Sequence, residues 1–178
     1  MKQITVLLFS LGILVGIWLF SSPTPGSFLD PSNDTVLKKV AAGDFSLPDL
    51  NGQTISLKNY KGKVVVLNFW ATWCAPCVKE IPDMIDVQKM FQDKGVQFIG
   101  ASVDLEGFKD VRPFLDKHQF KLNYPIIIAD HPMLNAYKNP AFLPTTFIID
   151  RKGIIRKETV GVLSREKLAS LLDEILEE

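Results

Sequence analysis

The feature that most constrains the fold is a short apolar run that leads into a pair of cysteines. Residues 64–70 read VVVLNFW, a β-branched and nearly apolar segment typical of a strand buried on both faces of an α/β sheet. Four residues after its end come Cys74-Ala75-Pro76-Cys77, and a helical segment then continues to residue 94, just before Gly95. The sequence therefore places both cysteines at the junction of a central strand and a helix.

This spacing allows the two cysteines to form a reversible disulfide. Residues three apart on a helix have Cβ atoms about 5 to 6 Å apart, and the first turn can tighten further. A helix N-terminus also presents unpaired N–H groups and the positive end of the helix dipole, which stabilise a thiolate at Cys74. Cys77 lies one turn deeper, so we expect it to be more buried and to react second.

The alternatives are an inert structural pair and one half of a metal site. A zinc site would need two further ligands. The only two histidines, His118 and His131, have neither partner cysteines nor close spacing, and we expect ordinary loop or helix-end positions for them. The sequence thus predicts neither a metal nor a cofactor.

The overall composition describes one globular domain of ordinary type. The 178 residues include 20 Lys+Arg and 20 Asp+Glu, and 47% are hydrophobic. Because there is no basic run and no net positive charge, we expect no nucleic-acid partner. Two cysteines cannot staple a small loop-rich scaffold, so they are free to do chemistry.

The N-terminal segment predicts the compartment. Residues 4–20 read ITVLLFSLGILVGIWLF, without a charge, and would cover about 26 Å as a helix. This is slightly short of a bilayer core but longer than a typical signal-peptide apolar region of about 7 to 15 residues. We favour a retained membrane anchor over a cleaved signal, and both over a buried core helix.

In the first two readings the domain lies outside the cytoplasm, because Lys2 and the amino terminus are the only positive charges before Lys38 and should stay inside. We expect an anchor or signal at residues 1–22, a linker rich in Ser and Pro at 23–42, and a folded domain at 43–178. A retained anchor gives a single-pass membrane protein, and a cleaved signal gives a periplasmic or secreted one.

The order of predicted elements indicates an α/β fold with a mixed sheet and helices on both faces. Residues 45–57 read as two short strands around the Asn51-Gly52 turn. Further strands are predicted at residues 64–70, 96–103, 125–129, 145–150 and 154–160, and helices at 74–94, 108–118, 132–137 and after Ser164. The turn Arg151-Lys152-Gly153 makes the last two strands a hairpin rather than a crossover.

Residues 69–77, FWATWCAPC, resemble a thioredoxin-type active site. With Leu143-Pro144-Thr145-Thr146-Phe147 downstream, the early hairpin and an insertion around residues 108–137, the chain resembles the membrane-anchored TlpA/ResA branch over roughly residues 43–176. The resemblance implies a thioredoxin-like fold with an N-terminal β-hairpin and a mid-domain insertion. It also implies a thiol-disulfide oxidoreductase that reduces protein disulfides.

The same resemblance assigns roles to individual residues. Cys74 and Cys77 would form the redox-active disulfide, with Cys74 attacking the substrate and Cys77 resolving the mixed disulfide. Pro144 would be a cis-proline facing the dithiol, and the backbone at Leu143 would pair with a substrate strand. The remaining substrate-binding residues would be Trp73, Pro76 and Thr145.

Cys77 must lose a proton, and here the sequence departs from cytoplasmic thioredoxins. Their buried aspartate behind the dithiol is matched by Asn68, which cannot take a proton. Glu80, three residues after Cys77 on the same helical face, is the nearest replacement, and ResA-type proteins resemble this chain in having a glutamate there. The alternative is that Glu80 is a solvated first-turn acid that only favours the helix dipole.

The dipeptide Ala75-Pro76 contains no histidine. Family members that oxidise or isomerise usually carry one, so its absence favours a reductant. By resemblance, electrons would come from a membrane thiol donor of the DsbD/CcdA type, and the acceptor would be the disulfide of apocytochrome c.

Other functions stay open at this point. A general extracytoplasmic disulfide reductant and a thiol reductant for copper-site assembly would use the same chemistry. A peroxiredoxin-like peroxidase fits less well because Ala71 stands where it needs a threonine. A copper chaperone of the Sco type fits less well because it uses a wider cysteine spacing and a distant histidine.

Overall fold

The structure is a computed structural model that describes residues 40–178. The predicted membrane segment and nearly all of the predicted linker lie outside these residues. In the described part of the chain, no helix has the length and apolar character that crossing a membrane would need. The boundaries at residues 22 and 42 stay predictions, although the linker overlaps a two-residue edge strand, β1 (Val40–Ala41).

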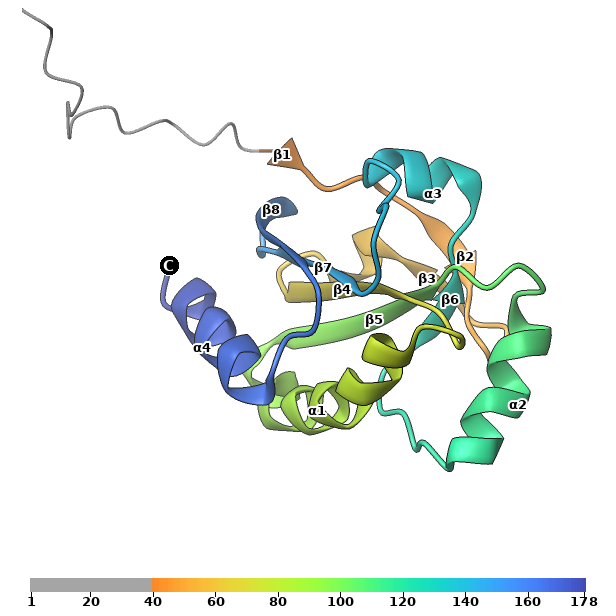
Figure 1. Cartoon of the computed structure of the whole chain (residues 1–178). Helices are drawn as coiled ribbons and strands as arrows, with labels where there is room; N and C mark the ends of the chain where they lie inside the picture. The colour runs from red at the N-terminus through yellow and green to blue at the C-terminus, as the bar shows by residue number, and fades with distance from the viewer. Residues whose placement is uncertain (1–39) are drawn as a thin grey trace, which may run out of the picture. The chain divides into compact units, whose positions relative to one another are not determined.

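A mixed six-stranded sheet in the order β1-β8-β7-β4-β5-β6 forms the centre of the domain (Figure 1). Its other strands are β4 (Val64–Trp70), β5 (Val96–Ser102), β6 (Ile126–Ile128), β7 (Thr145–Ile149) and β8 (Ile154–Val160). Strands β4, β5 and β6 are parallel, whereas β7 is antiparallel to both β4 and β8. The predicted α/β class and the mixed sheet are confirmed.

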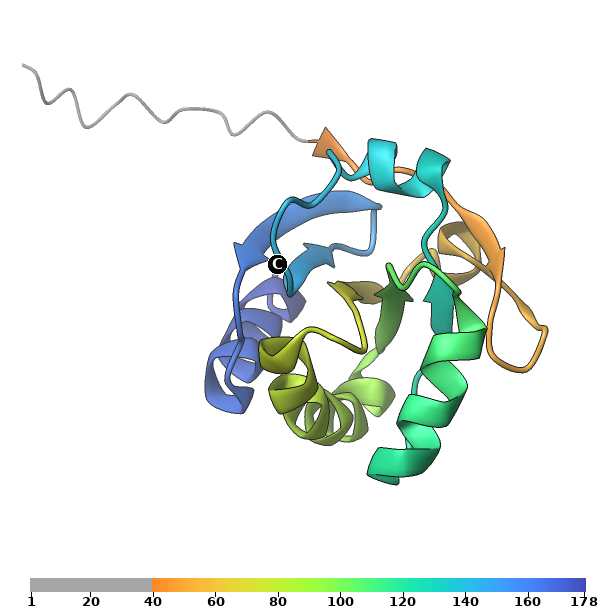
Figure 2. The same ribbon diagram turned by 45° about the vertical axis from the view of Figure 1, so that its right-hand side comes forward.

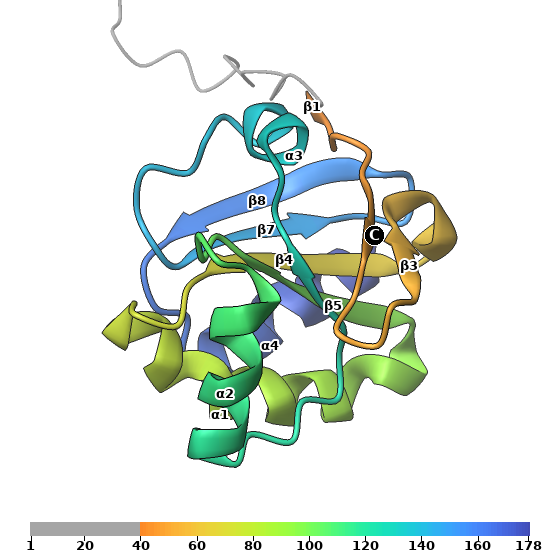
Figure 3. The same ribbon diagram turned by 90° about the vertical axis from the view of Figure 1, so that its right-hand side faces the viewer.

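Helices cover both faces of this sheet (Figure 2). The helices are α1 (Ala75–Phe91), α2 (Phe108–His118), α3 (His131–Ala136) and α4 (Arg165–Leu176), with short 3-10 segments η1 (Leu57–Tyr60) and η2 (Gln92–Lys94). Helices α1 and α4 pack on one face through buried residues such as Met84 and Leu172, and α3 packs on the other through Met133. Helix α2 adjoins the β6 side of the sheet (Figure 3).

The early hairpin is also present, as β2 (Ser46–Pro48) paired antiparallel with β3 (Thr54–Ser56). Most other predicted elements differ from the observed ones by one or two residues. The helix predicted at residues 74–94 is α1 followed by η2, with Cys74 as its N-cap rather than its first residue. Ser164 caps α4 as expected, since its side chain accepts a hydrogen bond from the backbone N–H of Lys167.

Strand β4 positions the functional site. All its residues except Asn68 are buried, as expected for a central strand between two parallel or antiparallel neighbours. Because β4, β5 and β6 are parallel, their carboxyl ends meet at one edge of the sheet, which is where α/β folds place their sites. The loop from β4 to α1 carries the cysteine pair at this edge, and Thr145 at the start of β7 lies opposite Phe69.

Candidate active site

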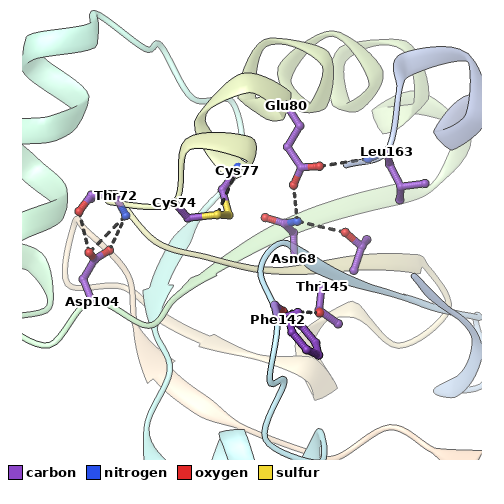
Figure 4. The surroundings of a disulfide bond; sticks show 10 residues. Asn68, Thr72, Cys74, Cys77, Glu80, Asp104, Phe142, Thr145 and Leu163 are labelled. Atoms are coloured by element: carbon purple, nitrogen blue, oxygen red, sulfur yellow. Dashed lines mark hydrogen bonds between the residues drawn. A yellow bond between two sulfur atoms is a disulfide. The ribbon is translucent and has the colours of Figure 1, made fainter. Parts of the chain in front are cut away.

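The two cysteines form a disulfide at the start of α1 (Figure 4). Cys74 is the N-cap residue, and its sulfur accepts a hydrogen bond from the backbone N–H of Cys77 over 3.3 Å. Cys74 is 5% exposed and Cys77 is 1% exposed. Cys77 is the more buried of the two, as expected for a resolving cysteine, and its backbone N–H at the N-terminus of α1 is directed at the attacking sulfur.

The residues around the pair divide into a buried and an exposed set. Trp70 is buried and packs against Phe114 at a centroid distance of 5.8 Å, so it serves the core. Trp73, in contrast, is 69% exposed directly before Cys74. Pro76 and Lys79 are exposed as well. Trp73 and Pro76 are therefore open to a substrate, as their predicted role requires.

Glu80 lies behind the disulfide and is almost completely buried, at 1% exposure. Its Oε1 accepts a hydrogen bond from Nδ2 of Asn68 over 2.8 Å, and its Oε2 accepts one from the backbone N–H of Leu163 over 3.2 Å. Burial raises the pKa of Glu80 to about 7; the charge of Asp83 adds to this rise, and the two hydrogen bonds oppose it. The reading of Glu80 as a solvated surface acid is wrong.

Asn68 fixes the position of this carboxylate. Its side-chain Nδ2 donates to Glu80 (Figure 4) and also, over 3.0 Å, to the hydroxyl of Thr146 on the adjacent strand β7. The residue that stands where cytoplasmic thioredoxins have an aspartate is thus the hydrogen-bond donor to the replacement acid. No local sequence pattern points to Thr146 or Leu163 in this role, because both belong to segments distant in the chain from Glu80 and Asn68.

The peptide bond between Leu143 and Pro144 is cis. Leu143 packs against the hydrophobic cluster that contains both cysteines, and Pro144 is buried, with its carbonyl accepting a hydrogen bond from Gly161 over 2.8 Å. Within residues 40–178 the backbone N–H and C=O of Leu143 have no hydrogen-bond partner. Both groups are therefore available to pair with an added strand.

Thr145 is placed differently from the other predicted substrate-binding residues. It is 2% exposed, and its hydroxyl donates a hydrogen bond to the carbonyl of Phe142 over 2.7 Å. Its side chain does not face solvent. Any effect of Thr145 on substrate binding therefore acts through the position of the loop that contains Leu143.

Several exposed apolar side chains lie on segments at the same end of the sheet as the disulfide, on loops or, for Val160, at the end of β8. They are Trp73, Leu105, Phe142, Val160 and Val162, with exposures from 46% to 98%. Val160 pairs with Thr145 across the sheet, and Val162 directly follows the Gly161 that binds Pro144. An exposed apolar surface of this kind indicates an interaction site for a protein rather than for a small polar molecule.

Asp104 is a second buried acid near the disulfide and was not among the predicted site residues. It lies in the loop after β5, is 4% exposed, and accepts hydrogen bonds from Thr72 and from Ser102. Thr72 is two residues before Cys74 (Figure 4). A local signal for this contact does not exist, since the two residues are 32 positions apart.

The histidines take the ordinary positions that were expected. His118 is the last residue of α2 and stacks on Phe120 at 5.5 Å, and His131 is the exposed first residue of α3. Across residues 40–178, no three His, Cys, Asp or Glu side chains come together in a group that could hold a metal ion.

The chain resembles known proteins of one kind in both its family match and its curated relatives. Residues 39–158 match the AhpC/TSA family. Thioredoxin-like protein YneN of Bacillus subtilis is 43% identical over 136 residues, covering 74% of this chain and 76% of that protein. Thiol-disulfide oxidoreductase ResA of Geobacillus thermodenitrificans is 39% identical and covers 75% of each chain, and ResA of Bacillus thuringiensis is 34% identical over 96% of this chain and 93% of its own.

Solved structures agree with the sequence matches. The crystal structure of a putative thiol:disulfide interchange protein DsbE from Chlorobium tepidum superimposes with a TM-score of 0.70 at 30% identity, over 78% of this chain and 96% of that one. The thioredoxin-like fold is therefore confirmed. With the disulfide at the start of α1, these matches show that the chain belongs to the AhpC/TSA family and is a thiol-disulfide oxidoreductase similar to ResA.

Proposed function

We propose that this enzyme reduces protein disulfides on the extracytoplasmic side of a membrane, and that the disulfide of apocytochrome c is its substrate. The observation that carries the reductase chemistry of the proposal is the buried carboxylate of Glu80 behind Cys77, whose pKa lies at about 7. The proposed location rests on the uncharged run at residues 4–20. A group that titrates near neutral pH can accept a proton and return it at the pH where the enzyme works. Glu80 thereby supplies the proton acceptor that Asn68 cannot.

The reaction that follows has two steps. The thiolate of Cys74 attacks one sulfur of the substrate disulfide, forming a mixed disulfide and releasing the other substrate sulfur as a thiolate. Cys77 then transfers its proton to Glu80 and attacks the sulfur of Cys74, which forms the enzyme disulfide and releases the second substrate thiolate. Two electrons pass from enzyme to substrate, and the substrate thiolates take up protons.

The oxidised enzyme needs a dithiol donor to regenerate its own dithiol. The resemblance to the ResA branch suggests a membrane thiol donor of the DsbD/CcdA type. The absence of histidine between the cysteines supports this direction of flow, because a histidine there would stabilise the reduced form and favour an oxidant.

The region around Leu143 supports a polypeptide as the acceptor. The unpaired backbone N–H and C=O of Leu143 can pair with an extended segment of the substrate. The exposed side chains of Trp73 and Phe142 can contact apolar side chains of that segment. This surface also suits a general reductant of extracytoplasmic disulfides. The choice of apocytochrome c over that alternative rests on the resemblance to the ResA branch.

The proposal is tested by trapping the mixed disulfide. In Cys77→Ser the second step cannot occur, so the substrate remains attached to Cys74. We expect a peptide with an oxidised Cys-Xaa-Xaa-Cys-His haem-attachment sequence to be trapped at least about tenfold faster than a matched peptide in which alanine replaces the histidine, a difference of about 1.4 kcal/mol. Equal trapping rates would favour the general reductant.

The direction of electron flow is tested by the reduction potential, followed through the fluorescence of Trp73 in thiol/disulfide buffers. We expect a value near or below about −220 mV, as for thioredoxin-like reductants. A value between about −180 and −120 mV would contradict the proposal, because proteins in that range act as oxidases or isomerases.

The location is tested on intact cells that produce the full chain. We expect the protein in the membrane fraction, with its domain digested by a protease added outside the cytoplasmic membrane. Removal of residues 2–22 should move it to the soluble cytoplasmic fraction, because the uncharged run at residues 4–20 would then be absent. A full chain that stays soluble in the cytoplasm would contradict this part of the proposal.

A further inference from the structure

Asp104 connects two loops at the disulfide end of the sheet. Its Oδ2 accepts a hydrogen bond from the backbone N–H of Thr72 over 3.0 Å, and its Oδ1 accepts one from the Thr72 hydroxyl over 2.6 Å. The hydroxyl of Ser102 donates to the same carboxylate over 2.7 Å. Figure 4 shows the carboxylate of Asp104 facing both donors of Thr72, beside Cys74.

These contacts hold the loop after β4 and the loop after β5 together. A carboxylate that is 4% exposed and accepts several hydrogen bonds holds its donors more firmly than a neutral acceptor would. A backbone hydrogen bond of 2.9 Å from Val103 to the carbonyl of Trp70 joins the same two segments. The loop from β4 to α1 and the loop from β5 to α2 are thus joined both through main chain and through Asp104.

Each loop presents an exposed apolar side chain directly after its contact residue. Trp73 follows Thr72 and is 69% exposed, and Leu105 follows Asp104 and is 98% exposed. Leu105 has no packing role in the folded domain at that exposure. Because the loop of Leu105 is joined to the loop of Trp73, the two exposed side chains together offer apolar surface to a partner.

Trp73 also forms part of the wall of an open groove next to the disulfide. The groove has a volume of about 550 Å³, and its lining includes Ala75, Val78 and Phe114. Its lining is mixed, because Thr72, Lys117 and His118 lie beside the apolar residues, and as an open depression of the surface it can accommodate a polypeptide segment with apolar and polar side chains. The polypeptide that brings its disulfide to Cys74 is the occupant that this chemistry fits.

We propose that Asp104 is a positioning residue that holds Trp73 and Leu105 together as a platform for apolar side chains of the polypeptide substrate. The platform rests on the proposed function, since it requires a protein as the disulfide substrate. Asp104 itself touches neither the substrate nor the sulfurs. Its effect should therefore be seen in substrate binding and not in the chemistry of the cysteines.

The test compares two substrates of the full-length enzyme in detergent. One substrate is a polypeptide disulfide, oxidised insulin, and the other is the small aromatic disulfide DTNB. Reduction of insulin is followed in turnover with dithiothreitol as reductant, whereas DTNB, which dithiothreitol reduces directly, is followed in a single turnover with prereduced enzyme freed of dithiothreitol. We expect Leu105→Ala and Asp104→Ala each to lower kcat/KM for insulin at least about fivefold, mainly through KM. The rate with DTNB, its pH profile and the reduction potential should stay at the wild-type values.

Matched variants separate positioning from general damage. Thr72→Ser keeps both donors and should recover most of the insulin rate, whereas Asp104→Asn keeps only one of the two acceptor oxygens and should recover only part of it. Val40→Ala removes an apolar side chain that is 43% exposed on β1, next to the end of β8 opposite Val160, and should change neither rate. If Asp104→Ala does not fold, Leu105→Ala still decides the question.

An unchanged insulin rate in Leu105→Ala would overturn the platform. An equal fall of the insulin and DTNB rates in Asp104→Ala, with a shifted pH profile, would also overturn it, because Asp104 would then act on the thiolate. A wild-type enzyme that reduces DTNB but not insulin would contradict the proposed function and the platform with it.

Discussion

Nδ2 of Asn68 and Oε1 of Glu80 are joined by a hydrogen bond of 2.8 Å behind the disulfide. This bond favours the charged form of Glu80, as does the second one from the backbone N–H of Leu163. Burial acts in the opposite direction and is the larger effect, so the pKa of Glu80 settles at about 7. The balance between burial and two donors keeps this carboxylate able to titrate at neutral pH.

Replacing Glu80 by glutamine should slow the second step of the reaction. Glu80→Gln keeps the shape of the side chain but cannot accept the proton of Cys77, and a positioned acid or base typically contributes about 100-fold or more to a rate. We expect the mixed disulfide to accumulate in a single turnover, while its formation by Cys74 is unchanged. Rapid-quench trapping and mass spectrometry measure both steps.

Glu174→Gln, at an exposed position of α4, is the matched control and should behave like the wild type. The pH dependence of the second step should show an apparent pKa of about 7 in the wild type and lose it in Glu80→Gln. A second step that keeps its rate and its pH dependence in Glu80→Gln would assign the proton acceptor to another group.

Removing the donor at position 68 should raise the pKa of Glu80 further. Asn68→Leu retains the approximate volume but removes the hydrogen bond to Oε1. Because hydrogen bonds to charged groups contribute about 1.5 to 3 kcal/mol, the apparent pKa of the second step should rise by about one to two pH units. Thr54→Val, at the exposed first position of β3, should leave this pH profile unchanged, and a profile that moves to lower pH in Asn68→Leu would contradict the role of Asn68.

The parts of this site that the sequence predicted share a local signal. The apolar run of β4, the cysteine spacing and the position of Glu80 three residues after Cys77 are all periodic features of one strand and one helix. Pro144 alone would read as a loop proline, and only the family motif around it pointed to the disulfide. Local patterns thus located the centre of the site.

The hydrogen bonds that support Glu80 and Asn68 had no local sequence signal, because they join segments that are distant in the chain. Leu163 and Glu80 are 83 positions apart, and Thr146 and Asn68 are 78 apart. Whether Glu80 is buried depends on these contacts, so helical spacing alone left two readings open. Strand β1 was missed for another reason, since two residues are too few to show an alternating pattern.

The raised pKa of Glu80 should also make stability depend on pH in a definite direction. Between about pH 4.5 and 7 the folded state holds a proton that the unfolded state has lost, so the free energy of unfolding decreases as pH rises through this window. A pKa that moves from 4.5 to about 7 corresponds to about 3 kcal/mol. Outside this pH range, Glu80 causes no further change in the free energy of unfolding.

Glu80→Gln removes this dependence. Urea unfolding of the oxidised protein at about pH 5 and about pH 8 should show that the variant gains stability relative to the wild type as pH rises, by up to about 3 kcal/mol. Glu174→Gln should follow the wild type at both values. A difference between Glu80→Gln and the wild type that stays constant with pH would mean that the pKa of Glu80 is not raised.

The hydrogen bond between Thr145 and Phe142 should affect binding of a polypeptide without affecting the cysteines. Thr145→Val has nearly the same shape but loses the hydroxyl that donates to the carbonyl of Phe142 over 2.7 Å. A hydrogen bond of this kind contributes about 1 kcal/mol, so we expect about a fivefold lower kcat/KM for oxidised insulin, because Leu143 is held less firmly for strand pairing. The DTNB rate and the reduction potential should not change, and an equal loss with both substrates would show that Thr145 acts on the reacting sulfurs instead.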